Sequence, residues 1–300
     1  MTDAPVLSNE TAAPHGSTPI GRVLRSVARL RRSRVGVVGA SILVFWIAVA
    51  LAAPLLAPFP PNQPLQPMAP PGTHAVGGTG VFWLGTDHLG RDLLSRIIWG
   101  ARTVLVIAPL ATLSAFIVGV SAGLIAGFKL GWLDELLSRV TDLVLAFPAL
   151  VLYIVIISKF GASALNIVLA VTLASSPAVM RLTRGLVLEL RNRAFVSAAQ
   201  LRGESLWYIM VVEILPNARG PLIVDACLRL GYVTITIGTL GFLGLGLPPP
   251  DPDWGGMINE TRQFALVFPY MVLFPCLAIS SLVLGFNLLA DGLRELSLQD

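Results

Sequence analysis

The chain has 300 residues, of which 55% are hydrophobic and 13% are charged, and its mean hydropathy is +0.77. Soluble domains carry about 25% charged residues, so this composition indicates a membrane protein rather than a soluble enzyme. The net charge of +4 comes from basic residues at the ends of apolar segments, with no basic patch interleaved with aromatics, which excludes nucleic acid as a partner.

Six segments are long or apolar enough to cross a bilayer, which takes about 20 apolar residues in a helix. The first is longer than the core of a signal peptide, about 7 to 15 residues, so we expect a retained helix rather than a cleaved one. The third is the weakest, and a full crossing there takes in residues 140–142 or continues past Lys159, whose long stem can reach the interface. The predicted spans are residues 35–59, 103–128, 143–158, 160–180, 230–250 and 263–290.

The placement of arginine and lysine sets the predicted orientation. With six spans and a cytoplasmic N-terminus, fifteen basic residues fall inside and five outside, as the positive-inside rule requires. Both termini are therefore expected in the cytoplasm. The inside residues are Arg22, Arg25, Arg29, Arg31, Arg32, Arg34, Lys129, Arg139, Arg181, Arg184, Arg191, Arg193, Arg202, Arg219 and Arg294, and the outside residues are Arg91, Arg96, Arg102, Lys159 and Arg262.

The predicted organisation is a basic cytoplasmic tail (1–34), a first membrane helix (35–59), an external segment (60–102) and a membrane core (103–295). The external segment begins with a proline-rich stretch that cannot be helical, and we interpret it as a spacer or as a contact for an external partner. Cys227 and Cys276 both lie in apolar runs, so no disulfide is expected.

The string LGTDHLGRDLLSRIIWGAR, residues 84–102, follows the proline-rich stretch. Thr86 or Asp87 can cap a short helix that lies at the membrane surface before the second span. Metal binding by Asp87 and Asp92 is disfavoured, because five residues is a poor same-face spacing and Arg91 and Arg96 are ready ion-pair partners. No metal site is expected.

A polar hairpin, residues 195–216 (FVSAAQLRGESLWYIMVVEILP), lies in the predicted cytoplasmic loop 185–218 between the fourth and fifth spans. We expect a helix over 185–202 that ends at a left-handed Gly203. Ser205 is a plausible N-cap for a second helix over 206–215, and Pro216 is expected to turn the chain again into span five. The alternative is an ordinary loop with a tight turn.

Two further features belong to span five and its outer end. Asp225 and Arg229 lie four residues apart and can pair on one helix face, either as a neutralised pair or as a contact with the transport pathway or a partner permease. The sequence LGFLGLG, residues 240–246, precedes three prolines and the run Asp253-Trp254-Gly255. Its glycines favour close helix packing beside a gate, with Trp254 at the membrane interface.

Three of these blocks, taken in order, resemble the permeases of bacterial ABC importers. Residues 84–102 resemble the second-permease signature of the dipeptide, oligopeptide and nickel class, and residues 240–255 resemble its FLGLG, proline and WG block. The hairpin is similar to the cytoplasmic loop on which the ATPase docks in this family. It departs from the family pattern in having Ser197 at the acidic first position, Arg202 at an apolar one, and Glu213 before a shifted Ile214.

The resemblance covers residues 35–295 and implies an all-α membrane protein with six transmembrane helices and a cytoplasmic coupling-helix hairpin between spans four and five. It implies a permease subunit in the bacterial inner membrane that forms half of the path for a peptide or similar solute. Its expected partners are a second homologous permease, one or two ATPase subunits that bind ATP and Mg²⁺, and an external solute-binding protein. The residues expected at the ATPase contact are Ala198, Ala199, Gly203, Glu204, Ser205, Leu215 and Pro216.

The sequence disfavours a self-contained enzyme. Neither Lys129 nor Lys159 stands in a phosphate-binding Gly-Lys-Ser/Thr loop, so we expect no ATP hydrolysis and no cofactor in this chain. A membrane-embedded hydrolase would need an intramembrane nucleophile and base, and none is evident. The main alternative is an ion-coupled secondary transporter, for which Asp225 and Arg229 would be the deep ionisable groups.

Overall fold

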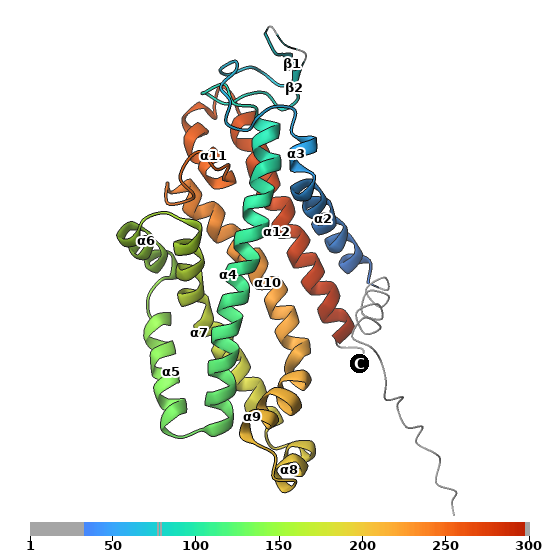
Figure 1. Cartoon of the computed structure of the whole chain (residues 1–300), viewed down its shortest axis with the longest axis vertical. Helices are drawn as coiled ribbons and strands as arrows, with labels where there is room; N and C mark the ends of the chain where they lie inside the picture. Colours follow the sequence, from blue (N-terminus) through green and yellow to red (C-terminus); the bar gives the residue numbers. More distant parts are fainter. Residues whose placement is uncertain (1–32, 77, 79, 298–300) are drawn as a thin grey trace, which may run out of the picture.

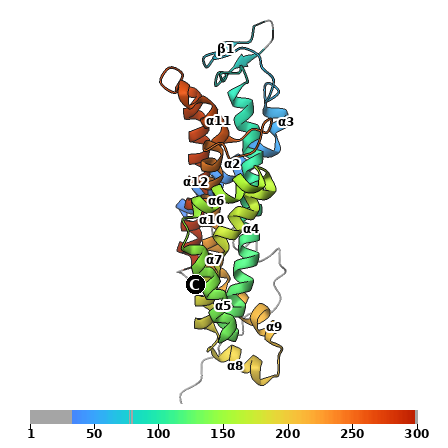
Figure 2. The same cartoon turned by 90° about the vertical axis from the view of Figure 1, so that its left-hand side faces the viewer.

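The chain folds as an elongated bundle of long helices in the computed structural model, which describes residues 33–76, 78 and 80–297 (Figure 1). Most of the predicted tail 1–34 lies outside these residues. One end of the bundle, here called the strand end, carries a short antiparallel pair, β1 (Thr73–His74) and β2 (Val81–Phe82). The opposite end, here called the hairpin end, carries α8 (Ala194–Leu201) and α9 (Leu206–Tyr208), as Figure 2 also shows.

Five helical segments of the described chain are long and apolar enough to cross a membrane. A sixth crossing would combine α5 (Trp132–Leu145) and α6 (Ala149–Phe160), which are bent by 84° relative to each other. Pro148, the N-cap of α6, lies in this break and disfavours helix at the residue before it. The weakness of the third predicted span is therefore visible as a broken helix. The five single segments are Arg34–Leu51, Leu93–Lys129, Ala164–Leu190, Leu206–Phe242 and Tyr270–Leu296.

The two helices with the most extensive contact in the bundle, α4 (Leu93–Lys129) and α7 (Ala164–Leu190), pack through glycines. A Cβ atom on Gly119 would lie 2.6 Å from the Cβ of Val179, and one on Gly123 would lie 2.6 Å from the Cβ of Thr183. Gly127 faces Val187 in the same way, at 2.8 Å. Small residues every four positions let two membrane helices approach closely, so this row sets the α4–α7 distance.

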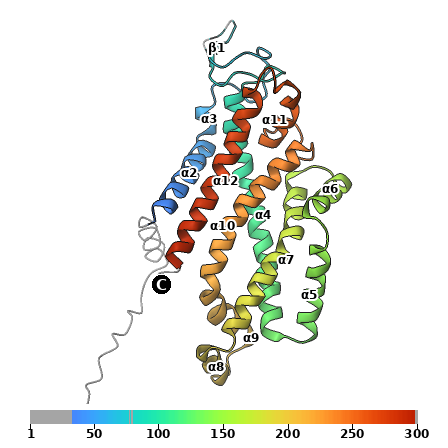
Figure 3. The same ribbon diagram turned by 180° about the vertical axis from the view of Figure 1, so that it is seen from behind.

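A second layer contains α2 (Arg34–Leu51), α10 (Leu215–Phe242) and α12 (Tyr270–Ser297), seen from behind in Figure 3. Helix α12 packs between the other two, and a Cβ on Gly285 of α12 would lie 2.9 Å from Ile42 of α2. The short α3 (Ala53–Leu56) follows α2 towards the strand end. Between α10 and α12 lie α11 (Trp254–Thr261) and η2 (Arg262–Phe264), a single 3₁₀ turn.

The predicted surface helix before span two is absent from the described chain, because α4 runs without a break from Leu93 to Lys129. The predicted caps, Thr86 and Asp87, are also wrong: Asp92 caps α4 by accepting from the Ser95 backbone N–H at 2.8 Å. The Thr86 hydroxyl instead accepts from the Ala69 N–H at 2.8 Å, which ties the proline-rich stretch to the bundle. The local apolar pattern after Asp92 belongs to the buried start of a membrane helix.

Candidate functional site

The hairpin end is built from a left-handed turn between two helices. Helix α8 ends at Leu201, and Gly203 adopts a φ of +76°, so the predicted left-handed conformation is confirmed. A residue with a Cβ is strained in this region, whereas glycine is not. The Ser205 hydroxyl accepts from the Tyr208 N–H at 3.2 Å, which confirms the predicted N-cap of the second helix. The turn therefore brings the chain back towards the bundle.

Two boundaries of the hairpin differ from the prediction. The expected continuous helix over 185–202 is interrupted, because α7 ends at Leu190 and α8 starts at Ala194. Pro216 does not turn the chain: residues Leu206–Phe242 form one continuous helical segment. Its part η1 (Ile209–Ile214) is a π-helix, and the missing N–H of Pro216 falls where the π pattern changes to α, so the proline is accommodated.

The inward face of the hairpin is an apolar cluster that anchors it to the bundle. Val196 and Ala199 of α8 are fully buried, as is Ile214 of η1. They pack in one core with residues of α4 and α7, including Phe128 and Val187. Ala199, which the family resemblance places at the ATPase contact, therefore points into the protein and not toward a partner.

The outward face of the hairpin carries large apolar side chains with no cover in the described chain. Leu201 is 90% exposed and Trp207 is 69% exposed, and they flank the Gly203 turn. Leu206, next to Trp207, is half exposed. Sequence reasoning missed these residues because it concentrated on the small ones. The available signal was their position, since apolar side chains in a polar loop have no obvious core partner.

Charged side chains of the hairpin are neutralised locally. Arg202 contacts Glu204 at 3.5 Å and Glu213 at 3.1 Å. The guanidinium thus bridges the turn and the π segment, which accounts for an arginine at a position that is apolar in the family pattern. Leu215 packs beside the buried cluster, whereas Pro216 is exposed. Of the predicted contact residues, Ala198, Gly203, Ser205 and Pro216 are exposed at this end.

Span five carries the predicted ion pair. Arg229 Nε lies 2.6 Å from Asp225 Oδ2, and the two side chains are about one-fifth exposed. The predicted pairing on one helix face is confirmed. Asp225 and Arg229 are the only two charged residues of the described chain between Arg219 and Asp251, so the pair lies in a membrane helix with no other charged residue nearby in sequence.

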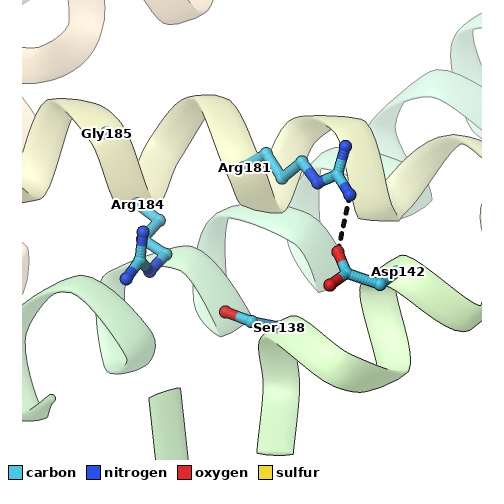
Figure 4. A pocket seen from close by; sticks show the side chains of 5 residues that line it. All are labelled: Ser138, Asp142, Arg181, Arg184 and Gly185. Atoms are coloured by element: carbon cyan, nitrogen blue, oxygen red, sulfur yellow. Dashed lines mark hydrogen bonds and ion pairs between the residues drawn. The ribbon is translucent and has the colours of Figure 1, made fainter. Parts of the chain in front are cut away.

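A cavity of about 460 Å³ lies between α5 and α7, away from that pair (Figure 4). Arg181 contacts Asp142 across it at 2.6 Å, and Arg184 contacts Asp134 at 2.6 Å. Ser138 and Gly185 complete its lining. Its arginines are matched by carboxylates from the facing helix, so these pairs attach the amphipathic α5 to α7.

Trp254 lies at the strand end of the bundle and is fully buried, so its side chain packs inside the protein. Its indole N–H donates to the Ile97 carbonyl at 3.0 Å, and its ring lies 5.0 Å from that of Trp46. A Cβ on Gly100 would lie 2.6 Å from the indole, which explains the glycine beneath it. The neighbouring glycines pack closely as expected, with Gly241 against the backbone of Gly256.

The acidic and basic residues before α4 join the external segment to α11. Arg91 pairs with Asp87 at 2.6 Å and also contacts Glu260 of α11. The predicted Asp87–Arg91 pair is confirmed, whereas Asp92 caps α4 instead of pairing with arginine. Asp253, the N-cap of α11, is buried, and its desolvation raises the pKa of the carboxyl to about 6.

Comparison with known proteins identifies the family. Residues 119–299 match the model of binding-protein-dependent transport system inner membrane components, and residues 18–71 match the N-terminal transmembrane domain of oligopeptide transport permease C. The chain belongs to the binding-protein-dependent ABC transport permeases. The family match includes the whole hairpin, the polar pair and α11.

Relatives of this permease align over most of its length. The dipeptide transport system permease protein DppC of Alkalihalophilus pseudofirmus is 39% identical over 267 residues, which are 89% of this chain and 86% of the relative. The di/tripeptide permease protein DppC of Pseudomonas aeruginosa is 37% identical over 98% of this chain and 96% of its own. The glutathione transport permease GsiD of Pectobacterium atrosepticum is 37% identical over 89% and 87%.

These matches decide between the functional alternatives. The chain is a multi-pass membrane permease subunit of an ABC importer, and the ion-coupled secondary transporter is not supported. The resemblance drawn from the three sequence blocks is confirmed, as is the all-α fold class. As a member of a binding-protein-dependent family, it works with a solute-binding protein and with ATPase subunits.

Proposed function

We propose that this permease carries short peptides or peptide-like solutes across the bacterial inner membrane, and that its hairpin end receives the force from a separate ATPase. The single observation that carries the coupling proposal is the split of the hairpin into two faces. One face is anchored in the bundle by buried residues of α8 and η1, whereas the other presents Leu201, Leu206 and Trp207 around the Gly203 turn. An exposed apolar surface of this kind is typical of a protein contact.

The proposed contact surface consists of Ala198, Leu201, Gly203, Ser205, Leu206 and Trp207, and Pro216 extends it along α10. Ala199 and Leu215 do not belong to this surface, but they hold its helices in place by packing in or against the buried apolar cluster. Glu204 stabilises the turn through its ion pair with Arg202. Because residues 206–242 are one continuous helical segment, a displacement of the hairpin moves the full length of α10. ATPase closure would thereby bias the bundle between inward and outward openings.

The proposed complex contains this chain, a second permease that supplies the other half of the path, and one or two ATPases, which bind ATP and Mg²⁺. Both termini and the hairpin face the cytoplasm, and residues 60–102 face outward. The basic residues of the described chain support this orientation: five lie at or near the outer end, and ten are on the hairpin side. The ten are Arg34, Lys129, Arg139, Arg181, Arg184, Arg191, Arg193, Arg202, Arg219 and Arg294.

Replacement of Gly203 by valine tests the coupling. The β-branched side chain should cost about 1 to 2 kcal/mol in a left-handed backbone and should also disturb the contact surface. We expect normal membrane abundance and normal recovery of the permease pair, because a Cβ at residue 203 would meet no atom of the described chain within 4 Å. Transport and solute-stimulated ATP hydrolysis by the assembled complex should fall together.

Gly131→Val is the matched control for this experiment. Gly131 also has a positive φ, +70°, and also meets no atom of the described chain within 4 Å of a built Cβ, but it lies between α4 and α5. It imposes the same type of backbone strain outside the hairpin. Normal transport by the Gly203→Val complex, or an equal loss in both variants, would contradict a coupling role for the hairpin.

A further inference from the structure

A row of polar side chains runs along one face of α10, the helix that links the hairpin end to the strand end. Its members, here called the α10 stripe, are Asp225, Arg229, Tyr232, Thr236 and Thr239. At 100° per residue they fall within about 80° of one another, and the row is about 21 Å long. This is most of the thickness of a bilayer core, about 30 Å.

The stripe is accessible in this chain and is not part of its core. Tyr232 is 67% exposed, and Asp225 and Arg229 are partly exposed. The Thr236 and Thr239 hydroxyls donate to carbonyls of their own helix at 2.9 Å, so they remain free to accept from a passing group. Beside the stripe, Val233 and Ile237 pack against α6 and α7.

The same region receives a polar side chain from a second helix. Tyr153 of α6 is buried and packs in one core with Val233 and Ile237 of α10. Helix α6 therefore borders the stripe on the side of Val233 and Ile237. The other side of the stripe stays open in the described chain.

Contact between such a polar surface and lipid is unfavourable. Ionisable side chains within membrane segments face a bundle interior or a water-filled path, because their exposure to hydrocarbon costs several kcal/mol. Asp225 and Arg229 are the only Asp, Glu, Lys or Arg residues between Arg219 and Asp251. Along the helix axis Arg229 lies about 20 Å and Asp225 about 26 Å from Phe242, within the length of a bilayer core of about 30 Å.

We propose that the α10 stripe lines the solute path on the side of this subunit. In this proposal, the Asp225–Arg229 pair transiently binds solutes that carry a free ammonium group and a free carboxylate group. The carboxylate of such a zwitterion can pair with Arg229 and its ammonium group can pair with Asp225, in place of the ion pair between the two side chains. Two ion pairs then replace one, and no net charge is left unpaired in the membrane. This inference rests on the proposed function in peptide transport.

The test uses the complete complex with its partner permease, ATPases and binding protein, reconstituted in liposomes, and radiolabelled alanyl-alanine as the probe. Three variants are compared: Asp225→Asn, Arg229→Gln, and both together. A solute contact predicts that all three lower the uptake rate by about tenfold or more, which corresponds to about 1.4 kcal/mol. The double variant is included because it removes both charges and leaves neither unpaired.

A purely structural pair gives a different pattern. Single variants would then be impaired by an unpaired charge, whereas the double variant would recover nearly wild-type uptake. That recovery would overturn the proposal. Loss of the partner permease from the purified double variant would also overturn it, by placing the stripe in the interface between the permeases. Arg139→Gln, which breaks an exposed pair with Glu135 at the same four-residue spacing on α5, should leave uptake unchanged.

The wild-type complex separates this proposal from the one on which it rests. If the wild-type complex takes up no alanyl-alanine, trialanine or glutathione, the peptide function itself is wrong. If it takes them up and the double variant does so equally well, only the role of the stripe is wrong.

Discussion

At the residue scale, Asp253 shows how a buried cap makes stability depend on pH. Its carboxylate accepts from the backbone N–H groups of Gly255 and Gly256, both at 3.2 Å, and so starts α11. Burial nevertheless outweighs these hydrogen bonds and raises its pKa from 3.8 to about 6. The folded state therefore binds this proton more tightly than the unfolded state does, and stability is lost as the pH rises from about 4 to about 6.

The corresponding prediction concerns Asp253→Asn, which cannot ionise but can still accept one of the two capping hydrogen bonds. The shift of about two units is equivalent to roughly 3 kcal/mol in the wild type. We expect the variant to lose less stability than the wild type between pH 4.5 and pH 7.5. The measurement is thermal unfolding of the purified permease pair at both pH values, with the difference between variant and wild type as the readout.

That difference cancels the pH dependence that both proteins share. A variant that is shifted by the same amount at both pH values would show that Asp253 is ionised throughout and that its burial carries no pH-dependent cost. The sequence predicted no helix directly after Asp253. Nothing in the local sequence revealed that the carboxylate is buried.

At the element scale, the packing of α4 on α7 depends on Gly119, Gly123 and Gly127. Gly123→Val should place a branched side chain against Thr183 and the backbone of α7, where a Cβ would already lie 2.6 Å from the Thr183 Cβ. Overpacking of this kind costs about 1 to 3 kcal/mol. We expect lower membrane abundance and a lower unfolding temperature of the permease pair in detergent.

Gly185→Val on α7 is the control, because a Cβ at Gly185 would meet no atom of the described chain within 4 Å. It introduces the same side chain into a helix without the clash. If both variants unfold at the same temperature, the glycine row does not set the distance between the helices.

The same elements show what the sequence can and cannot determine. Hydropathy located the five helices that are long enough to span and the bent α5–α6 pair, but it ended the predicted spans at charges, whereas helices continue through charges that find partners. Helix α4 thus begins at Leu93, ten residues before the predicted span, because Arg96 is buried at the strand end. Span five likewise starts near the hairpin, because the π segment carries the helix past Pro216. The sequence shows that Gly119, Gly123 and Gly127 recur every four residues, but it does not show which helix packs against them.

The hairpin was placed correctly because its signals are local: a glycine that permits a left-handed turn and a serine that caps the next helix. Which face of α8 is buried depends on α4 and α7, which lie far away in the sequence. Ala199 was therefore assigned to the contact surface together with Ala198, although only Ala198 is exposed. The apolar tip of the hairpin became visible only once the core beneath it was known.

At the scale of the whole molecule, the two ends of the bundle are chemically different. The hairpin end carries exposed apolar side chains, and most basic residues of the described chain lie on its side of the bundle. At the strand end, Thr86 and Tyr270 of α12 hold the backbone of Ala69, the Tyr270 hydroxyl donating to the Ala69 carbonyl at 3.0 Å, and Arg91 contacts Glu260 of α11. The α9–α10 segment connects these ends as one 37-residue helix. A movement at one end can therefore reach the other without passing through a flexible joint.

The coupling proposal requires the hairpin end to face the cytoplasm, and thiol labelling can test this orientation. The native Cys227 and Cys276 are first replaced by alanine, and single cysteines are then introduced at Leu266 and at Ser197. Leu266 lies between η2 and α12 at the strand end and is fully exposed, and Ser197 is exposed on α8 at the hairpin end. The permease pair is expressed without its ATPases, so that a docked subunit does not shield Ser197.

In intact spheroplasts, a membrane-impermeant maleimide should label Leu266→Cys and not Ser197→Cys. After the membrane is permeabilised, both should react, because both side chains are exposed in the folded chain. The reason is the charge asymmetry, since moving the ten basic residues on the hairpin side to the outside would oppose the positive-inside rule. Labelling of Ser197→Cys in intact spheroplasts would place the hairpin outside the cell, out of reach of any ATPase, and the coupling proposal would fail with the orientation.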